Sequence, residues 1–200
     1  MTFQQDASGA MRYPAKGTVN NVLFKIPAIL WRMGLGPIQG HFQLVLSTWG
    51  RKSGLPRHTM LSRAVFQGKS YVLSGWNQRS DWYKNLSEDN RVTVQDERQT
   101  YAARARRVTQ MEEYTRVMGH ILSSGGDTHF QPWLQSLDIR PEITDLVTKH
   151  ERVYLVALDL CEDNGHPPPM DADLKWVWAV PAIAIVTGWL HHHRKGKGKP

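Results

Sequence analysis

One short segment, residues 50–59, concentrates the side chains that can bind an anionic group. It combines cations and polar donors with two glycines: Gly50, Arg51, Lys52, Ser53, Gly54, Arg57, His58 and Thr59. Glycine permits backbone conformations that a Cβ forbids, so the amides of residues 51–53 and the guanidinium of Arg57 can converge on one ligand. The pattern predicts a site for a phosphorylated or polycarboxylate ligand. A basic hairpin turn whose cations are only solvated has the same pattern, and the segment alone does not decide between them.

A second segment, residues 71–86, adds aromatic and polar side chains. A strand is expected to end at Ser74 and Gly75, and a helix to begin near Asp81. The side chains that would face a ligand from these two elements are Leu73, Ser74, Gly75, Trp76, Trp82, Tyr83 and Asn85. Aromatic residues at the start of a helix also fill protein cores, which is the alternative for Trp82.

Alternating and helical apolar patterns predict the elements that position these two segments. The expected strands cover residues 42–48, 58–66, 70–74, 91–95, 100–108 and 153–160. Expected helices cover residues 18–33, a stretch beginning with a capping-box pattern at 109–112 and ending near 122, and residues 141–149. Strands joined by short turns, with helices to one side, predict an α+β protein built on an antiparallel barrel or sheet.

Composition divides the chain into one domain and its extensions. We expect a flexible N-terminal arm at residues 1–17, a barrel domain at 18–160, a stiff proline-rich linker at 161–173 and an apolar helix with a basic tail at 174–200. The net charge is +7, and four of the cations lie in the last seven residues. Nucleic acid is therefore not an expected partner. Cys161 is the single cysteine and no signal peptide is indicated, so a cytoplasmic protein is expected.

Several classes of chemistry lack their motifs. The chain has neither a Gly-x-Ser-x-Gly elbow nor the spacing of a phosphate-binding P-loop. His41, His120, His129 and His150 lack metal-ligand spacing, so no metal is expected. The basic run at residues 104–107 is interpreted as a solvated face, and part of an anion-binding rim is the alternative.

The two ligand-facing segments together resemble the deazaflavin-dependent nitroreductase family, which includes the F420H2-dependent quinone reductases. The resemblance rests on the sequence Thr-Trp-Gly-Arg-Lys-Ser-Gly-Leu-Pro-Arg at 48–57, a glycine turn at 68, Asp-Trp-Tyr-Lys-Asn-Leu at 81–86 and Arg-Val-Thr-Val at 91–94. It extends over about residues 19–160. It implies the split β-barrel of flavin reductases, with flanking helices.

The resemblance also implies a function, which is hydride transfer from reduced coenzyme F420. This cofactor is a 5-deazaflavin with a phosphate and an oligoglutamate tail, and a basic turn suits such a tail. By family likeness, residues 51–53 and 57–59 would hold the tail and the ring edge, residues 73–76 would lie beside the ring, and residues 82, 83 and 85 would form the second wall. Ser74 and Tyr83 are the candidates for donating a hydrogen bond to the acceptor as it gains negative charge.

The stretch before the last strand departs from the family pattern. Family members often carry tyrosines there, whereas this chain has His129, Phe130 and Trp133. The expected acceptor is an electron-poor organic molecule, namely a quinone, a nitro compound or an unsaturated carbonyl compound, and the missing tyrosines disfavour the reduction of nitro drugs. An FMN-binding split-barrel reductase and a non-catalytic cofactor-binding protein are the alternatives. The sequence leaves the oligomeric state open, and a homodimer is one candidate.

Residues 176–190 contain no charged side chain. As a helix they would span about 22 Å, less than the about 30 Å of a bilayer's hydrocarbon core. Tryptophans near both ends and the basic tail favour association with a membrane surface. A buried helix that covers the barrel or a partner subunit is the alternative.

Overall fold

The computed structural model describes residues 31 and 43–171, apart from residues 98 and 125–129. The expected arm at 1–17, most of the helix expected at 18–33 and the apolar segment at 174–200 lie outside the described residues. No helix in the described part of the chain has the length and apolar character needed to cross a membrane.

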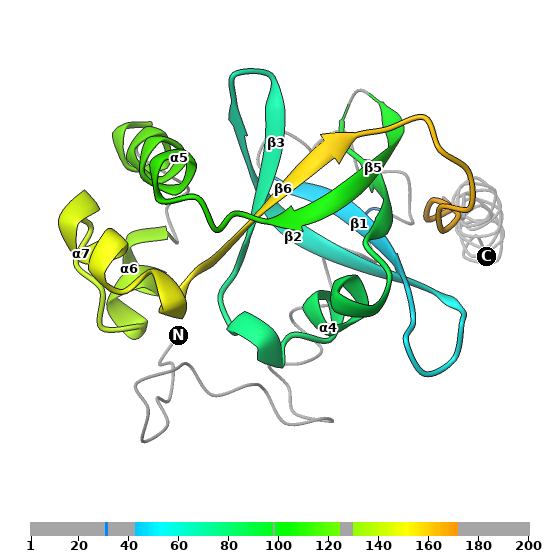
Figure 1. Ribbon diagram of the computed structural model, residues 1–200, viewed down its shortest axis with the longest axis horizontal. Helices are drawn as coiled ribbons and strands as arrows, with labels where there is room; N and C mark the ends of the chain where they lie inside the picture. Colours follow the sequence, from blue (N-terminus) through cyan, green and yellow to red (C-terminus); the bar gives the residue numbers. More distant parts are fainter. Residues whose placement is uncertain (1–30, 32–42, 98, 125–129, 172–200) are drawn as a thin grey trace, which may run out of the picture.

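Six antiparallel strands close into a barrel (Figure 1). The strands are β1 (Gln43–Trp49), β2 (Pro56–Phe66), β3 (Lys69–Ser74), β4 (Arg91–Gln95), β5 (Thr100–Arg107) and β6 (Tyr154–Leu160). Around the barrel they follow the order β1-β2-β3-β6-β5-β4. Gln67 and Gly68 connect β2 to β3 with φ of 50° and 76°. Positive φ at both positions is typical of a two-residue hairpin turn. The predicted α+β barrel is confirmed, with every strand boundary within two residues of its expected position.

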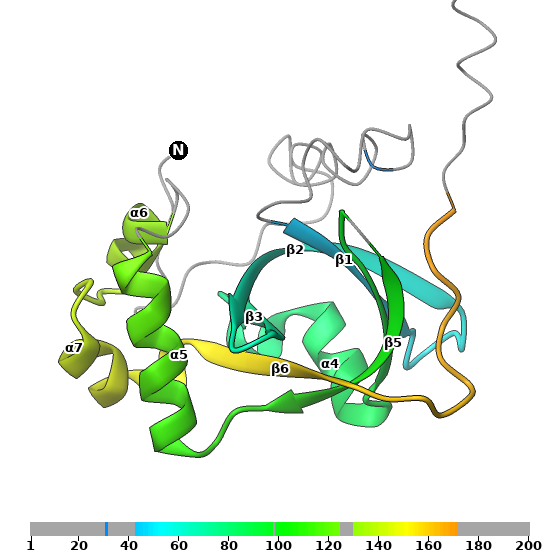
Figure 2. The ribbon, with the colours of Figure 1, turned by 90° about the horizontal axis from the view of Figure 1, so that it is seen from above.

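Helices occupy two places around the barrel (Figures 1 and 2). The first group lies to one side of the barrel and comprises α5 (Met111–Ser123), α6 (Phe130–Ser136) and α7 (Ile143–Thr148), followed by the short η3 (His150–Arg152). The short η2 (Asn77–Arg79) leads into α4 (Asp81–Glu88), which follows β3. The sequence did not predict α6, because its seven residues include a proline and follow a glycine- and serine-rich stretch.

The capping box expected at residues 109–112 is not formed. The N-cap of α5 is Gln110, one residue later than the pattern requires, and it makes no side-chain cap hydrogen bond. Glu112 instead forms an ion pair with Arg116 one turn along the helix, at 3.6 Å.

Two apolar clusters follow from the alternation of side chains along the strands. Inward-facing residues such as Leu46, Val94 and Val156 fill the barrel together with Trp82 of α4. Outward-facing residues of β3 and β6, such as Leu155, pack against α5, α6 and α7. Helix α4 therefore contributes to the barrel interior, whereas the other three helices cover an outer face.

The segment expected to be a linker packs on the barrel instead. Residues 161–171, which we call the strap, run back along β1 and β4 (Figure 2). The Trp49 indole donates to the Gly165 carbonyl at 2.9 Å, and the Gln95 amide donates to the Met170 carbonyl at 3.1 Å. Met170 is buried against Trp31 and Val45. Prolines in this segment stiffen a docked chain rather than a free spacer.

Candidate functional site

The turn between β1 and β2 is closed by its own backbone. The Gly50 amide donates to Leu55 O at 2.9 Å, and the amides of Ser53 and Gly54 donate to Gly50 O at 3.0 and 2.8 Å. A Cβ on Gly50 would lie 2.9 Å from Leu55 O, and Gly54 has a φ of +64°. Both glycines are therefore required by the geometry of the turn.

The expected convergence of backbone amides on a ligand is not observed. The Ser53 amide is used inside the turn, and the Arg51 amide donates to Asn85 Oδ1 of α4 at 3.3 Å. A tight turn satisfies its donors internally, and Asn85 takes up a further one. Two of the three amides are therefore already used, and anion binding by this turn depends mainly on side chains.

Arg51 and Asn85 join the turn to α4. The Arg51 guanidinium donates to Asp81 Oδ1 at 2.9 Å and to Asn85 Oδ1 at 3.0 Å. Asn85 is buried and donates from Nδ2 to Thr48 Oγ1 of β1 at 3.1 Å. Both residues, predicted to bind a cofactor, hold three elements in register here, and the charge of Arg51 is already paired with Asp81.

Lys52 and Arg57 remain as the accessible cations of the turn. Both are exposed, and neither forms an ion pair with any residue that the structure describes. The Arg57 guanidinium donates to Ser53 Oγ at 3.2 Å, and the same oxygen accepts from the Leu55 amide at 3.3 Å. Ser53 therefore orients Arg57 without neutralising it.

Strand alternation separates the three predicted residues at the start of β2. Arg57 and Thr59 pair with Thr48 and Leu46, whereas His58 pairs with Ser47 on the opposite face. His58 Nδ1 lies 2.8 Å from Ser47 Oγ. The side chain of His58 therefore cannot share one site with those of Arg57 and Thr59.

The predicted residues at the end of β3 are all taken up by packing within the protein. Leu73 and Trp76 pack against the cluster beneath α5–α7, together with Trp133. Ser74 is fully buried, with its Oγ 3.1 Å from Ser80 Oγ. A Cβ on Gly75 would lie 2.5 Å from the Trp133 indole nitrogen, so this glycine is required by the close approach of α6.

Trp82 is a core residue rather than an exposed wall. Only 7% of its surface is exposed, and it packs among the inward-facing residues of the barrel. An indole at the start of a short helix buries a large apolar area when the helix covers the end of a barrel. This corrects the expectation that Trp82 lines the ligand side of α4.

Tyr83 faces a second group of side chains that the sequence did not single out. Its ring centroid lies 5.2 Å from that of Tyr154, the first residue of β6. The Arg107 guanidinium carbon lies 3.7 Å from the Tyr154 ring centroid, and Arg107 forms a 2.9 Å ion pair with Glu151. Gln78 donates to the Tyr154 hydroxyl at 3.4 Å. We call Tyr83, Tyr154, Arg107 and Glu151 the aromatic cluster.

The charges in the aromatic cluster are fixed by their surroundings. Burial raises the pKa of the Tyr83 phenol, and the nearby Arg107 charge offsets this only in part. Burial alone would lower the pKa of Arg107, but its hydrogen bond with Glu151 reverses the effect and raises it. The same hydrogen bond lowers the pKa of Glu151. At neutral pH Tyr83 is therefore a hydrogen-bond donor beside a permanent cation.

Helix α4 connects the turn to the aromatic cluster. Asp81 and Asn85 bind the turn through Arg51, while Tyr83 on the same helix meets Tyr154. The two missed residues, Tyr154 and Arg107, belong to strand ends, where a sequence gives no sign of which neighbours they meet. Helix α4 thus links a tyrosine ring and hydroxyl to a turn with two cations that pair with no described carboxylate, a combination that suits a planar ligand with an anionic extension.

A separate cavity of about 590 Å³ lies at the opposite end of α4. Residues 86–91 and Arg104 line it. Its arginines are already paired, Arg91 with Asp89 and Arg104 with Asp163. None of the lining residues belongs to the turn or to the aromatic cluster, so the cavity is a separate feature.

The sequence matches one protein family, and the fold resembles solved structures at low identity. The model of the family described as F420H(2)-dependent quinone reductase matches residues 32–144. A search of curated proteins finds no match.

Three of the similar structures illustrate the range. The heme storage protein HutZ from Vibrio cholerae is 18% identical, with 69% of this chain and 91% of HutZ covered and a TM-score of 0.43. The Rv2991 protein from Mycobacterium tuberculosis is 16% identical over 80% of this chain and 86% of its own, with a TM-score of 0.43. The F420-H2 dependent reductase FDR-A is 17% identical over 60% of this chain and 95% of its own, with a TM-score of 0.42.

Proposed function

Because the chain belongs to the F420H(2)-dependent quinone reductase family, we propose that it transfers a hydride from reduced coenzyme F420 to a quinone or another electron-poor organic acceptor. The family model covers more than half of the chain, including the turn, α4 and β5. Coenzyme F420 would supply the hydride, and the protein would hold cofactor and acceptor against each other.

One observation carries the proposal. The strands contain six arginines, of which five pair with carboxylates: Arg63, Arg91, Arg104, Arg106 and Arg107. Arg57 is the exception, since within the part of the chain that the structure describes it bonds only to a serine hydroxyl. Together with Lys52, it gives the turn two positive charges that no described carboxylate neutralises. These charges suit the phosphate and glutamate carboxylates of the F420 tail.

The fit of the cofactor rests on this donor set. Lys52 offers an ammonium and Arg57 a planar guanidinium that Ser53 holds in place, so the turn presents cations of both types to an extended anion. Arg51 and Asn85 would act indirectly, by holding the turn on α4. The anionic tail would therefore bind mainly by the side chains of the turn.

The aromatic cluster would form the reacting end of the site. The partly exposed ring of Tyr83 would offer an apolar face to a planar acceptor, while Tyr154, buried beneath Arg107, would support that ring. As the acceptor gains negative charge, the Tyr83 hydroxyl would donate a hydrogen bond to it. The positive charge of Arg107 would stabilise this negative charge, although the ion pair with Glu151 partly neutralises Arg107. Ser74, the other predicted donor, is buried against Ser80, so Tyr83 is the stronger candidate.

The experiment that tests the proposal separates cofactor choice from turnover. The protein is titrated with F420 and with FMN while fluorescence is followed, and the reduced F420 complex is then mixed with a benzoquinone or a nitroaromatic compound. We expect tighter binding of F420 than of FMN, and oxidation of reduced F420 by the quinone. Preference for FMN would overturn the cofactor assignment. Tight F420 binding without turnover of any acceptor would instead indicate a cofactor-binding protein.

We also propose that residues 174–200 bring the protein to a membrane surface, where lipid-soluble quinones are found. The support is the uncharged stretch at 176–190, which has tryptophans near both ends and is followed by basic residues. Sedimentation with vesicles that contain anionic lipid tests this. Deletion of residues 174–200 should abolish co-sedimentation, and an unchanged pelleted fraction would contradict the proposal.

A further inference from the structure

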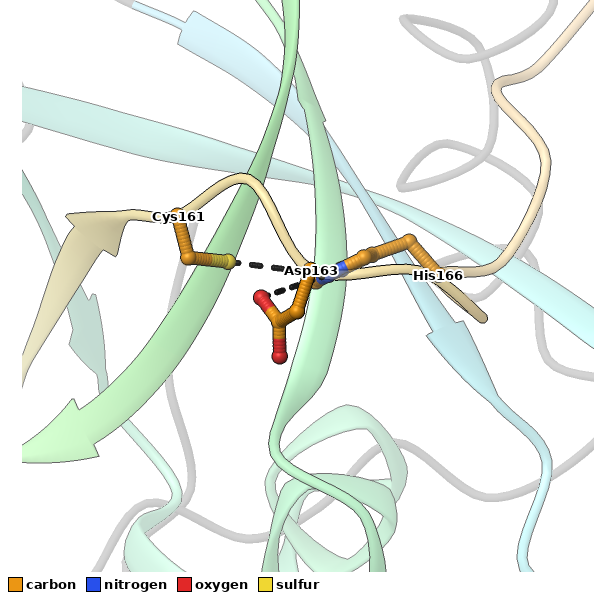
Figure 3. Close-up of side chains that lie close together, drawn as sticks. All are labelled: Cys161, Asp163 and His166. Carbon is orange, nitrogen blue, oxygen red and sulfur yellow. Dashed lines mark hydrogen bonds and ion pairs between the residues drawn. The ribbon is translucent and has the colours of Figure 1, made fainter.

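The strap brings together three side chains of the types that bind transition metals. Cys161, Asp163 and His166 each direct one ligand atom toward the others, and these atoms all lie within 4.8 Å of one another (Figure 3). All three side chains are partly buried. All three belong to the first half of the strap, directly after β6. In the sequence they are far from Lys52 and Arg57, the cations of the turn between β1 and β2.

We propose that Cys161, Asp163 and His166 form a Zn²⁺ site. With Zn–S of about 2.3 Å and Zn–N or Zn–O of about 2.0 Å, tetrahedral coordination separates sulfur from nitrogen by about 3.5 Å and nitrogen from oxygen by about 3.3 Å. The observed distances are 3.5 Å from Cys161 Sγ to His166 Nε2 and 3.3 Å from His166 Nε2 to Asp163 Oδ1. These two separations match those of a tetrahedral site, and the third pair, the Cys161 sulfur and the Asp163 carboxylate oxygen, lies within 4.8 Å.

The surroundings of His166 orient it as a ligand. Its Nδ1 lies 2.9 Å from the Val92 carbonyl oxygen, and a carbonyl can only accept, so Nδ1 carries the hydrogen. In the neutral imidazole the lone pair is therefore on Nε2, the atom that faces Cys161 and Asp163. A backbone carbonyl that accepts from the second nitrogen is a common partner of metal-bound histidine.

The other two ligands are held in a similar way. The Cys161 amide donates to Ala102 O of β5 at 3.2 Å, which fixes the start of the strap. Arg104 binds Asp163 through Oδ2 and leaves Oδ1 toward the histidine, so the carboxylate would bind as a monodentate ligand. Sulfur, nitrogen and oxygen ligands together suit Zn²⁺, and three protein ligands leave the fourth position for water.

The site would fasten the strap next to the cofactor turn. Gly165, between two of the ligands, accepts the hydrogen bond from the Trp49 indole at 2.9 Å. Trp49 ends β1 and directly precedes Gly50. The bound metal would therefore hold one support of the turn, although the existence of the site does not depend on the proposed reductase function.

Cobalt is the probe that tests the proposal, because Co²⁺ bound to a thiolate gives a charge-transfer absorption band. The full chain is used with His191, His192 and His193 changed to alanine, so that the histidine tract does not bind metal. We expect the band to saturate at one equivalent of Co²⁺ and to disappear when Zn²⁺ is added. Since even indirect partners of metal ligands alter affinity by 10- to 100-fold, Cys161→Ser should weaken Zn²⁺ binding by about 100-fold.

His150→Gln is the matched control. Its Nδ1 lies 3.0 Å from a backbone carbonyl and its Nε2 3.2 Å from Glu151, but no cysteine is part of that arrangement. This variant should bind Zn²⁺ as tightly as its parent. A thiol that only donates a hydrogen bond to His166 has the same sulfur–nitrogen separation, and it would give no charge-transfer band. Absence of the charge-transfer band in the parent protein would overturn the proposal, and this result requires no substitution at the site. Persistence of the band in Cys161→Ser would also overturn it.

Discussion

Two basic segments of this chain look alike in sequence but differ in the structure. Residues 51–57 and residues 104–107 each contain three arginines or lysines. In the second segment every arginine pairs with a carboxylate: Arg104 with Asp163, Arg106 with Glu113 and Asp159, and Arg107 with Glu151. The expected solvated face at 104–107 is therefore an ion-paired one. In the first segment Arg51 is paired, whereas Lys52 and Arg57 have no carboxylate partner among the described residues.

From this difference we predict that pairing, and not the density of positive charge, distinguishes a binding segment from a structural one. An arginine that already faces a carboxylate gains little from an external anion, because its charge is neutralised locally. A cation that faces only solvent or a hydroxyl can still pair with a negatively charged group of a ligand. We therefore expect changes at Lys52 and Arg57 of the turn to affect cofactor binding, and changes at Arg104 and Arg106 of β5 to affect stability.

The largest expected effect separates binding from chemistry. Tyr83→Phe removes the hydroxyl that would stabilise charge on the acceptor, so kcat should fall by about 100-fold while F420 affinity changes little. Steady-state kinetics and a fluorescence titration measure the two quantities. Tyr101→Phe is the matched control, since that hydroxyl bonds to Ser70 elsewhere in the barrel, and its kcat should stay within about twofold of the parent. An undiminished kcat in Tyr83→Phe would remove Tyr83 from the mechanism.

The next effect concerns the support of the turn. Asn85→Ala would leave the Thr48 hydroxyl and the Arg51 amide without their buried partner, which should cost about 2 kcal/mol of unfolding free energy. Urea denaturation measures it. Asn90→Ala, an exposed asparagine that accepts from Arg104, should cost less than about 0.5 kcal/mol. Equal losses in the two variants would show that Asn85 does not hold the turn.

A smaller effect is expected from the paired segment. Arg106→Gln removes the ion pairs with Glu113 and Asp159, which should cost about 1 kcal/mol, because both partners are only partly buried. F420 affinity should be unchanged. The hydrogen bond from Arg106 lowers the pKa of Glu113 from 4.5, so its contribution to stability is complete above about pH 4.5 and is lost as the pH falls through the lower folded-state pKa.

Thermal unfolding between pH 3 and pH 7 shows this pH dependence. The parent protein should lose stability below about pH 4.5 more steeply than Arg106→Gln does. Identical pH profiles would mean that the Arg106 ion pair contributes nothing to the folded state.

The smallest effect tests the orientation of Arg57. Ser53→Ala removes the oxygen that accepts from the Arg57 guanidinium and from the Leu55 amide, so F420 affinity should fall about threefold. Isothermal titration calorimetry measures it. Ser123→Ala, on α5, removes a comparable exposed hydroxyl bond and should leave the affinity unchanged.

The barrel could be predicted closely from the sequence, because alternation of apolar residues reports directly which strand face is buried. The turn between β2 and β3 followed from its glycine, and the start of α4 from the residues around Asp81. Helix α6 could not be predicted, because its short sequence contains a proline and its helical form depends on packing of Phe130 and Leu134 against the barrel.

The site was predictable only where one segment carries it. The basic turn was recognised, but the sequence does not show which cations a distant carboxylate neutralises; Asp81 pairs with Arg51 across 30 residues. Tyr154 and Arg107 were missed because their contact is made only when the ends of β5 and β6 meet. Trp82 was assigned to the ligand side because the sequence does not reveal that α4 turns this face into the barrel.

The most direct measurement compares F420 affinity in two double variants that remove the same charge. K52Q/R57Q takes two positive charges from the turn, and R104Q/R106Q takes two from β5. At about tenfold for each charge-assisted contact, K52Q/R57Q should weaken F420 binding by between about 10- and 100-fold, with unfolding free energy nearly unchanged. R104Q/R106Q should bind F420 as the parent does and unfold more easily. Equal affinities in the two variants would contradict the account.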